Sequence, residues 1–367
     1  MKYYLAPLEG ITTYIYRRAY HTHYRPMEKY FTPFLVPHTK KDFNTREKND
    51  ILPAHNPGMN LVPQILTNDA KGFLDTVEKL KGYGYDEVNL NLGCPSKTVV
   101  SKGRGSGFLI HTEELNRFLD EIYAKADVKI SIKTRIGKFD ADEWGELLRI
   151  YNQYPLEELI VHPRLQKDFY KNTPNLDVFA MAAEESRNPL CYNGDITTVE
   201  EYERFCERFP TIEAIMIGRG LIANPGLVRE IQTGEKMQKD ELHVFLRELK
   251  ADYQACMPDL PVLFKMKEIK AEEVKEVEVT TEENTETEVA TEEVKESKLK
   301  AFGTKVKSGL QKHGKNIAKG AVIGLGLVAA YAIGSRAGGS DDDSDVADDS
   351  DYVEIDEAES TDETSEN

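Results

Sequence analysis

Hydrophobic and polar positions along the first 235 residues alternate between two patterns. Runs of four to seven residues rich in Val, Ile, Leu and Tyr are typical of buried β-strands. Between most of them lie longer segments with apolar residues every three to four positions, which are typical of amphipathic helices. Eight strands are predicted: Tyr3–Leu8, Tyr30–Leu35, Leu61–Leu66, Glu87–Leu92, Lys129–Arg135, Leu159–His162, Leu190–Asn193 and Ala214–Ile217.

Start signals mark several of the intervening helices. Asn68, Thr112 and Thr198 each stand where a helical pattern begins, as N-cap residues do, and Glu201 completes a capping box with Thr198. No GxGxxG turn follows the first strand, which argues against a dinucleotide-binding sheet. Eight strand–helix units therefore predict an α/β fold, a closed (β/α)8 TIM barrel over residues 1–235.

The pattern changes after the barrel. Residues 236–269 contain one amphipathic helix at Asp240–Cys256 and the start of another at Leu263–Ile269, so we expect a partial helical domain. Residues 270–300 repeat Glu, Lys, Val and Thr. Such a polar tract cannot bury enough apolar area to offset the entropy of ordering, which predicts an acidic low-complexity linker.

Charge is spread unevenly along the chain. The formal net charge is -17, but residues 340–367 hold fourteen acidic and no basic residues and are predicted to form a disordered acidic tail. Residues 1–267 carry a formal charge of only -2. The folded part is thus nearly neutral, and a polyanionic partner stays compatible with it, because local basic clusters set the binding field.

Residues 301–339 form a basic stretch followed by an apolar, Gly-rich one. The uncharged run 320–335 is sixteen residues long, shorter than the ~20 residues that usually cross a bilayer. A membrane span is therefore one interpretation, and a collapsed or surface-associating segment is the one we favour. The chain opens on a strand-like segment and not on a secretory signal, so we expect a cytoplasmic protein. We also expect a monomer.

The cysteine pattern points to chemistry at one position. Among four cysteines there is no CxxC pair and no metal-ligand spacing, so neither a metal site nor a disulfide framework is expected. In the run Asn89–Ser96 a short strand leads into a turn that presents Cys94, where Gly93 permits a tight path and Pro95 fixes the exit. Catalytic groups of barrels sit at such strand ends. A small buried cysteine is the alternative, but the basic, Gly-rich continuation 97–107 favours a loop over a site.

Polar side chains close other predicted strands. The amide of Gln64 can donate to and accept from a planar heterocycle at once, or it can satisfy nearby backbone. Lys133 ends an alternating strand, and a lysine in a barrel mouth implies a negative or electron-rich partner. His162 and Arg164 could hold a ring and a phosphate or a structural carboxylate, and we favour the ligand.

Two glycine-containing loops follow the last two predicted strands. They are Asn193-Gly194-Asp195 and Gly218-Arg219-Gly220. Barrel enzymes often bind phosphate at this place through exposed backbone N–H groups, and an arginine adds a bidentate charge. Together the two loops predict a phosphorylated cofactor.

In order and spacing, these motifs resemble the tRNA-dihydrouridine synthase family of flavin-dependent barrels. The resemblance covers about residues 3–268. The motifs that carry it are Ala6–Thr12, Asn89–Pro95, Lys133–Arg135, His162–Arg164, Asn193–Asp195 and Ile217–Pro225.

The resemblance implies a reaction and a cofactor site. FMN would lie across the barrel mouth, NADPH (or NADH) would reduce it, and a hydride would pass to C6 of a uracil in tRNA. Cys94 would protonate C5, and an unperturbed thiol with a pKa of about 8.5 is largely protonated at neutral pH. The implied cofactor residues are Pro7, Leu8, Glu9, Gln64, Lys133, His162, Asn193, Gly194, Asp195, Gly218 and Arg219.

The expected RNA contacts are basic. Lys97, Lys102 and Arg104 beside Cys94, and Arg164, are candidates for phosphate binding, and the target uridine must leave the stack to react. A second basic and aromatic group is a candidate for the same role, but a solvated loop is the favoured interpretation for it: Tyr24, Arg25, Lys40, Lys41 and Arg46.

The chain departs from the family pattern in three places. Leu8 replaces the usual Met and Thr13 the usual Asp or Asn, and the linker cuts short the helical bundle that clamps tRNA in family members. Two other functions stay open at this stage. One is a flavin oxidoreductase acting on a free pyrimidine, and the other is a non-catalytic RNA-binding or membrane-tethered protein.

Overall fold

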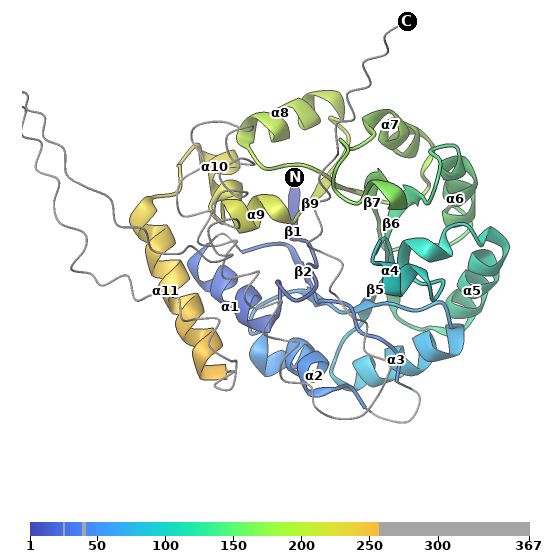
Figure 1. The fold of residues 1–367 in the computed structure, drawn as a ribbon, viewed down its shortest axis with the longest axis horizontal. Coiled ribbons are helices and arrows are strands. Elements are labelled where there is room, and N and C mark those ends of the chain that lie inside the picture. Colours follow the sequence, from blue (N-terminus) through green and yellow to red (C-terminus); the bar gives the residue numbers. More distant parts are fainter. Residues whose placement is uncertain (25, 39–41, 257–367) are drawn as a thin grey trace, which may run out of the picture.

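A ring of helices surrounds a sheet of short parallel strands (Figure 1). The computed structural model describes residues 1–24, 26–38 and 42–256. The strands are β1 (Lys2–Leu5), β2 (Lys29–Phe31), β3 (Leu61–Val62), β4 (Gln64–Ile65), β5 (Glu87–Leu92), β6 (Lys129–Gly137), β7 (Leu159–Leu165), β8 (Leu190–Asn193) and β9 (Ala214–Ile217).

The α-helices follow the strands in turn. They are α1 (Tyr14–His23), α2 (Thr45–Ile51), α3 (Ala70–Gly82), α4 (Lys97–Val100), α5 (Thr112–Lys125), α6 (Glu143–Tyr151), α7 (Leu176–Glu185), α8 (Val199–Arg208), α9 (Arg219–Ala223), α10 (Leu227–Thr233) and α11 (Lys239–Cys256). Three short 3-10 helices are η1 (Pro53–His55), η2 (Gly105–Phe108) and η3 (Gln166–Asp168).

The strand order shows how the sheet curls into a barrel. It runs β3-β2-β1-β9-β8-β7-β6-β5-β4 with parallel pairing, and only Pro63 separates the two end strands in sequence. Proline has no N–H to donate into a ladder, so the third predicted strand is divided there. The carbonyl of Pro63 instead accepts from the backbone N–H of Asn89 at 2.9 Å. The predicted α/β barrel is confirmed.

Two predicted strands are longer than the real ones. β1 ends at Leu5, and β2 ends at Phe31, with Leu35 joined to Ile65 only through an isolated bridge. β7, in contrast, continues past His162 to Leu165. These differences lie at the carboxyl ends of the strands, where the chain turns into the loops of the barrel mouth.

The predicted helix starts are partly wrong. Asp69 and not Asn68 caps α3, because the Asp69 carboxylate accepts from two backbone N–H groups of the first turn. Thr112 lies one position inside α5 and makes no cap. The capping box predicted at Thr198 is confirmed.

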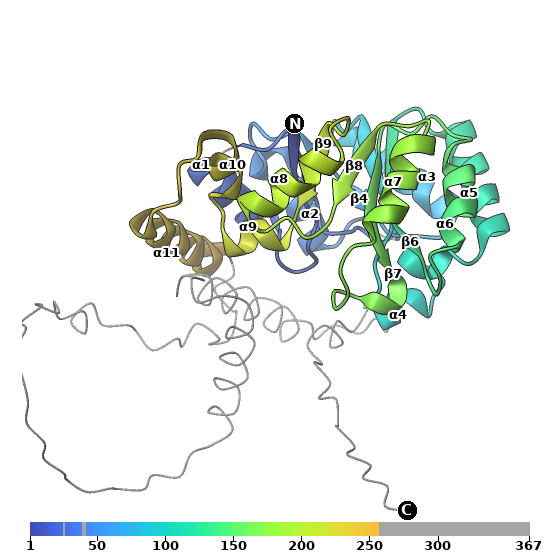
Figure 2. The same cartoon turned by 90° about the horizontal axis from the view of Figure 1, so that it is seen from above.

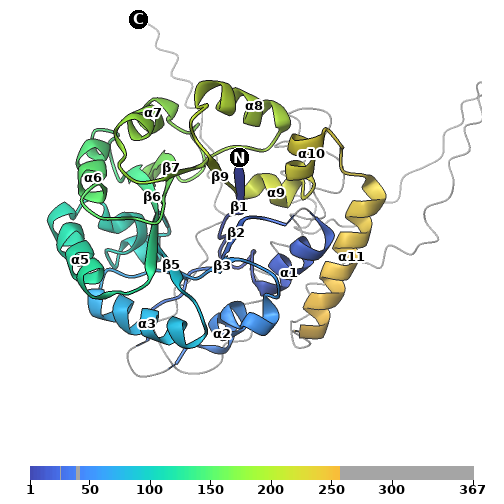
Figure 3. The ribbon, with the colours of Figure 1, turned by 180° about the vertical axis from the view of Figure 1, so that it is seen from behind.

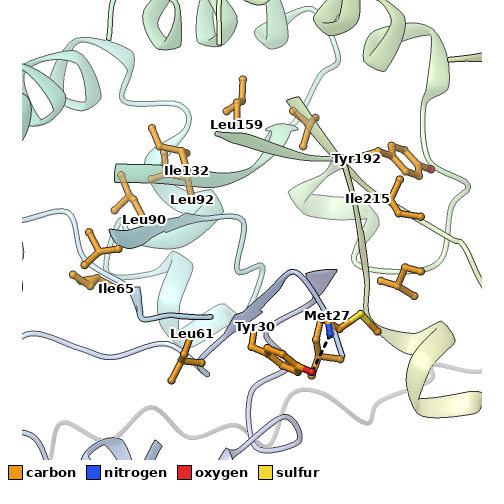
Figure 4. Packing of buried hydrophobic residues seen from close by; sticks show 14 of the residues in the cluster. Met27, Tyr30, Leu61, Ile65, Leu90, Leu92, Ile132, Leu159, Tyr192 and Ile215 are labelled. Carbon is orange, nitrogen blue, oxygen red and sulfur yellow. Dashed lines mark hydrogen bonds between the residues drawn. The ribbon is translucent and has the colours of Figure 1, made fainter. Parts of the chain in front are cut away.

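Alternation along the strands divides the core into two parts. Outward side chains such as Leu90, Ile132 and Leu159 pack beneath the helices (Figure 4). A second set fills the barrel interior: Tyr4, Ala6, Phe31, Val62, Ile160, Cys191, Ala214 and Met216. These interior side chains pack beneath the polar groups at the carboxyl ends of the strands.

Helix α11 lies outside the ring, against α1 (Figures 1 and 3). The ring of Phe245 meets those of Tyr16 and Tyr24, with centroids 6.1 and 5.0 Å apart, and Arg18 pairs with Asp252 at 3.0 Å. The predicted helix at 240–256 is confirmed.

Several predictions fall outside the described residues. They concern the helix at 263–269, the linker at 270–300, the basic and apolar segment at 301–339, and the tail at 340–367. Within the described ranges, no helix combines the length and the apolar character needed to cross a membrane.

Candidate active site

The backbone on both sides of the Cys94 thiol is held by hydrogen bonds. Asn91 Oδ1 accepts from the N–H groups of Gly93 and Cys94, each at 3.0 Å. Ser106 Oγ donates to the Cys94 carbonyl at 2.8 Å, and Arg135 Nε donates to the Gly93 carbonyl at 2.9 Å. The backbone that carries the Cys94 thiol is therefore fixed, and with it the direction in which the side chain leaves the backbone.

The immediate surroundings of Cys94 are apolar. Cys94 is only 8% exposed and packs in a small cluster with Leu66 and Val99. Gly105 approaches so closely that a Cβ there would lie 2.7 Å from the Cys94 carbonyl oxygen. Its φ of +55° also favours glycine. Cys94 as a whole is therefore largely closed to water.

A chain of amides links the Cys94 turn to the barrel interior. Asn91 Nδ2 donates to Gln64 Oε1, and Gln64 Nε2 donates to Asn89 Oδ1, both at 2.8 Å. Asn89 Nδ2 in turn donates to Ser131 Oγ at 3.0 Å. Gln64 thus bonds two side chains, unlike either sequence-based interpretation. It retains one N–H and one lone pair for a ligand.

An open cavity lies at the carboxyl ends of the strands, and the space in it is about 480 Å³ with the adjoining open solvent included. Nine of the eleven predicted cofactor residues line it: Pro7, Leu8, Lys133, His162, Asn193, Gly194, Asp195, Gly218 and Arg219. The other two lie outside its lining, Gln64 in the amide chain and Glu9 in an ion pair with Arg46 at 2.8 Å. Over the described ranges, no three or more His, Cys, Asp or Glu side chains gather as a metal site would need.

Lys133 brings a cation to this cavity that the protein does not neutralise. Burial, and next the charge of Arg135, lower the pKa of Lys133 to about 8. In the part of the chain that the structure describes, its ammonium has no hydrogen-bond or ion-pair partner. Because enclosing an unpaired ammonium is costly, the site fits a negative or electron-rich ligand.

His162 is a neutral donor in the same cavity. Burial, followed by the charges of Arg135 and the cations around it, lowers the pKa of His162 well below its ordinary value. Arg164 Nη1 lies 2.9 Å from His162 Nε2, and since a guanidinium only donates, Nε2 accepts. The imidazole proton is therefore assigned to Nδ1, where it can donate to a ligand.

Asp195 is the carboxylate around which two arginines gather. Arg164 forms a bidentate pair with it, and Arg219 Nη2 donates to Oδ1. With Lys133 and Arg135, four cations surround His162, and positive charge exceeds the single negative charge of Asp195. This excess suits a phosphate dianion.

Arg164 does not lie where the sequence-based RNA assignment puts it. Its side chain is 1% exposed, and besides Asp195 it donates to the Asn172 carbonyl at 2.6 Å. The interpretation of Arg164 as the partner of a structural carboxylate is the one that the geometry favours. The side chain is too deep to serve as a surface contact.

The other predicted RNA residues lie at the same end of the barrel as the cavity. Lys97 and Lys102 are exposed, on α4 and just after it, and Arg104 is half-buried with Nε 3.4 Å from Asn68 Oδ1. Figure 2 shows α4 beside the lower end of β7. These three cations lie on the helix and loop that follow Cys94 in the chain.

Three residues of the site were not assigned a role from the sequence. Arg135 stands two positions after Lys133, which the sequence places in the barrel mouth, so the strand alternation contained a signal for it. Asn91 stands two positions after Asn89 on β5, and no inward position was predicted on that strand. Tyr170 follows η3, with Arg219 4.9 Å and Arg135 5.5 Å from its ring centroid. No periodic pattern marks that loop residue.

Comparison with known proteins agrees with this geometry. The family model described as dihydrouridine synthase matches residues 4–308. The chain belongs to the dihydrouridine synthase family. The family resemblance expected from the motifs is confirmed.

Individual relatives of the family share part of their length with this chain. The tRNA-dihydrouridine synthase B of Pasteurella multocida is 30% identical over 247 residues, 65% of this chain and 70% of that protein. The tRNA-dihydrouridine(16) synthase of Pseudomonas syringae pv. tomato is 28% identical over 277 residues, 69% of this chain and 82% of that protein. Among solved structures, morphinone reductase in complex with tetrahydroNAD covers 65% of this chain and 89% of its own at 13% identity, with a TM-score of 0.44.

Proposed function

We propose that this protein reduces uridine in tRNA to 5,6-dihydrouridine with FMN as its cofactor and NADPH (or NADH) as electron donor. The observation that carries the proposal is the position of one fixed thiol, Cys94, at the same barrel end as a cavity with excess positive charge. When bound, FMN supplies the hydride that adds to C6 of the uracil.

The residues around the cavity fit a flavin phosphate ester. Arg219 and the backbone of Gly194 and Gly218 would hold the phosphate, as would the N–H of Asp195. A Cβ at Gly194 would collide with the Tyr192 ring, so the loop depends on glycine there. Lys133 supplies the cation for the electron-rich side of the isoalloxazine ring.

Further contacts to the ring would come from β4, β7, β8 and the residues after β1. His162 Nδ1 and Gln64 Nε2 each have a proton to donate. Pro7, Leu8 and Asn193 line the cavity with His162, and Glu9 completes the implied set from outside the lining.

Cys94 acts as the general acid in this proposal. Its Sγ–H bond breaks as a C5–H bond forms on the uracil, and solvent returns a proton to the thiolate afterwards. Leu66 and Val99 exclude water around the sulfur, and Asn91, Ser106 and Arg135 hold its direction. Positioned proton donors of this kind contribute about 10²- to 10⁴-fold to rates.

The substrate reaches the site from the basic side of the mouth. Lys97, Lys102 and Arg104 would bind phosphates of the tRNA, and the target uridine would unstack to enter the cavity. Arg164 has a different task in this proposal, because it holds Asp195 and through it Arg219.

Purified full-length protein tests the proposal directly. We expect flavin absorption bands, and dihydrouridine at defined positions after incubation with NADPH and unmodified tRNA. Cys94→Ala should keep the flavin but lose most of the product. A colourless protein that cannot be reconstituted with FMN would contradict the proposal. Reduction of free uracil but not of tRNA would favour the free-pyrimidine alternative.

A further inference from the structure

Helix α11 reaches the loop between β1 and α1 through the side chain of Tyr253. The buried residues of α11 recur at helical spacing along one face, and they are Leu242, Phe245, Leu246, Leu249 and Tyr253. Tyr253 stands in the last turn and is 6% exposed. Its hydroxyl donates to the Ile11 carbonyl at 3.5 Å and lies 3.3 Å from Thr13 Oγ1. Because Tyr253 gives its one proton to the carbonyl, the Thr13 hydroxyl donates to Tyr253.

Thr13 occupies the N-cap position of α1 without capping the helix. An N-cap threonine usually accepts from a backbone N–H of the first turn, but within the described residues the Thr13 side chain makes no such bond. The Asp50 carboxylate accepts from the Tyr14 N–H at 2.6 Å. Thr13 is also one of the positions at which the chain departs from the family pattern. Its hydroxyl bonds Tyr253 instead of the helix, which ties the start of α1 to the last turn of α11.

The loop between β1 and α1 is a compact turn built around Leu8. The Leu8 N–H donates to Thr12 Oγ1 at 2.8 Å, and the Leu8 carbonyl accepts from the N–H groups of Ile11 and Thr12, each at 3.0 Å. Arg17, which is fully buried, donates from Nη1 to the Thr12 carbonyl at 2.7 Å. Leu8 and Ile11 therefore belong to one hydrogen-bonded unit, so a displacement of Ile11 also displaces Leu8.

The same loop forms one wall of the cavity. Ala6, Pro7 and Leu8 are among the lining residues. Ala6 and Leu8 also lie against the loop after β9, because a Cβ on Gly218 would be 3.2 Å from Ala6 Cβ and 3.5 Å from Leu8 Cδ2. The position of the loop between β1 and α1 thus determines the shape of the cavity on this side.

We propose that Tyr253 is a positioning residue for the cofactor, because its hydroxyl holds the loop between β1 and α1 where it forms this wall. Tyr253 is not one of the lining residues, so it acts through Ile11, Thr13 and Leu8. Because FMN as the ligand of the cavity is itself proposed, this inference rests on the proposed function. It gives α11 a task at the cofactor site in addition to its packing against α1 (Figures 1 and 3).

Titration of the flavin-free full chain with FMN, followed by flavin fluorescence, tests this role. We expect Tyr253→Phe to raise the Kd about fivefold, because it removes both bonds to the loop. Thr13→Val should raise the Kd about threefold, because one of the two bonds remains, and Thr13→Ser, which keeps the hydroxyl, should bind as wild type does. The double variant Thr13→Val/Tyr253→Phe should bind about as weakly as Tyr253→Phe alone, since both substitutions remove the same contact.

Tyr24→Phe is the matched control. Tyr24 also contacts α11, with its ring centroid 5.0 Å from that of Phe245, but its hydroxyl donates to Met237 Sδ at 3.5 Å and not to the loop. We expect the Kd of this variant for FMN to equal that of wild type. Urea unfolding of each variant verifies that the titrated protein is folded.

The outcomes separate this inference from the proposed function. If wild-type protein binds FMN and Tyr253→Phe binds it equally tightly, this inference alone is wrong. It is also wrong if Tyr24→Phe weakens binding as much as Tyr253→Phe does, since a general loss of packing against α11 would then explain both. A double variant whose loss is the product of the two single losses would contradict the route through Thr13. If wild-type protein does not bind FMN, the proposed function fails and this inference with it.

Discussion

Charged side chains have partners within the protein at one end of the barrel, whereas positive charge is in excess at the other end. Near the amino ends of the strands, Lys29 pairs with Glu87 at 2.7 Å, and Tyr4 donates to Glu158 at 2.9 Å. At the carboxyl ends, Lys133 has no partner over the described ranges, and positive charge accumulates. A balanced pair leaves no charge for a ligand and is costly to break on one side only, whereas an unbalanced excess is available to a ligand.

The largest expected effect is a loss of the reaction at the barrel mouth without a loss of the folded, flavin-binding protein. Cys94→Ala should lower kcat for dihydrouridine formation about 10³-fold, because it removes the proton donor. Flavin content should not change, since Cys94 lies outside the cavity lining. Quantifying dihydrouridine in tRNA measures the effect. Cys206→Ala, on α8, is the control, and equal losses in both variants would contradict the assignment.

Removing one lysine from each end should change stability in opposite directions. Lys29→Met leaves the Glu87 carboxylate buried without its partner and should lower the free energy of unfolding by about 3 kcal/mol. Lys133→Met removes an enclosed, unpaired ammonium and should raise the stability of the flavin-free protein by about 1 kcal/mol. Urea unfolding of flavin-free protein at pH 7 measures both. If both variants are less stable than wild type, the two ends of the barrel do not differ in how their lysines are neutralised.

The pH dependence of the free energy of unfolding tests the same comparison at the amino ends of the strands. Burial raises the pKa of Glu158 from 4.5 to about 7. Because the folded state holds the proton more tightly, stability should fall by about 2 kcal/mol as the pH rises from 4.5 through 7, and level off above about pH 8. Glu158→Gln should remove this fall, and Glu157→Gln, a more exposed neighbour, should not. Urea midpoints across this range decide it.

Strand alternation in the sequence predicted much of this arrangement. It could not predict which side chains pair with one another. Lys133, the phosphate loops and the Cys94 turn follow from patterns within a few residues. The pairing of Arg164 with Asp195, 31 positions apart, depends on how β7 and β8 meet in the closed barrel. The place of Tyr170 between two arginines depends on the same closure.

The smallest expected effect tests whether the excess charge acts on the cofactor. Arg219 is half-exposed and makes one hydrogen bond to Asp195, so most of its donors remain for a phosphate. Arg219→Gln should therefore weaken FMN binding about tenfold, close to 1.4 kcal/mol, and leave riboflavin binding nearly unchanged. Flavin fluorescence titration of flavin-free protein measures both ligands. Arg208→Gln, which removes an exposed pair with Asp177, is the control. An equal loss for FMN and riboflavin would mean that Arg219 supports the loop and does not contact the phosphate.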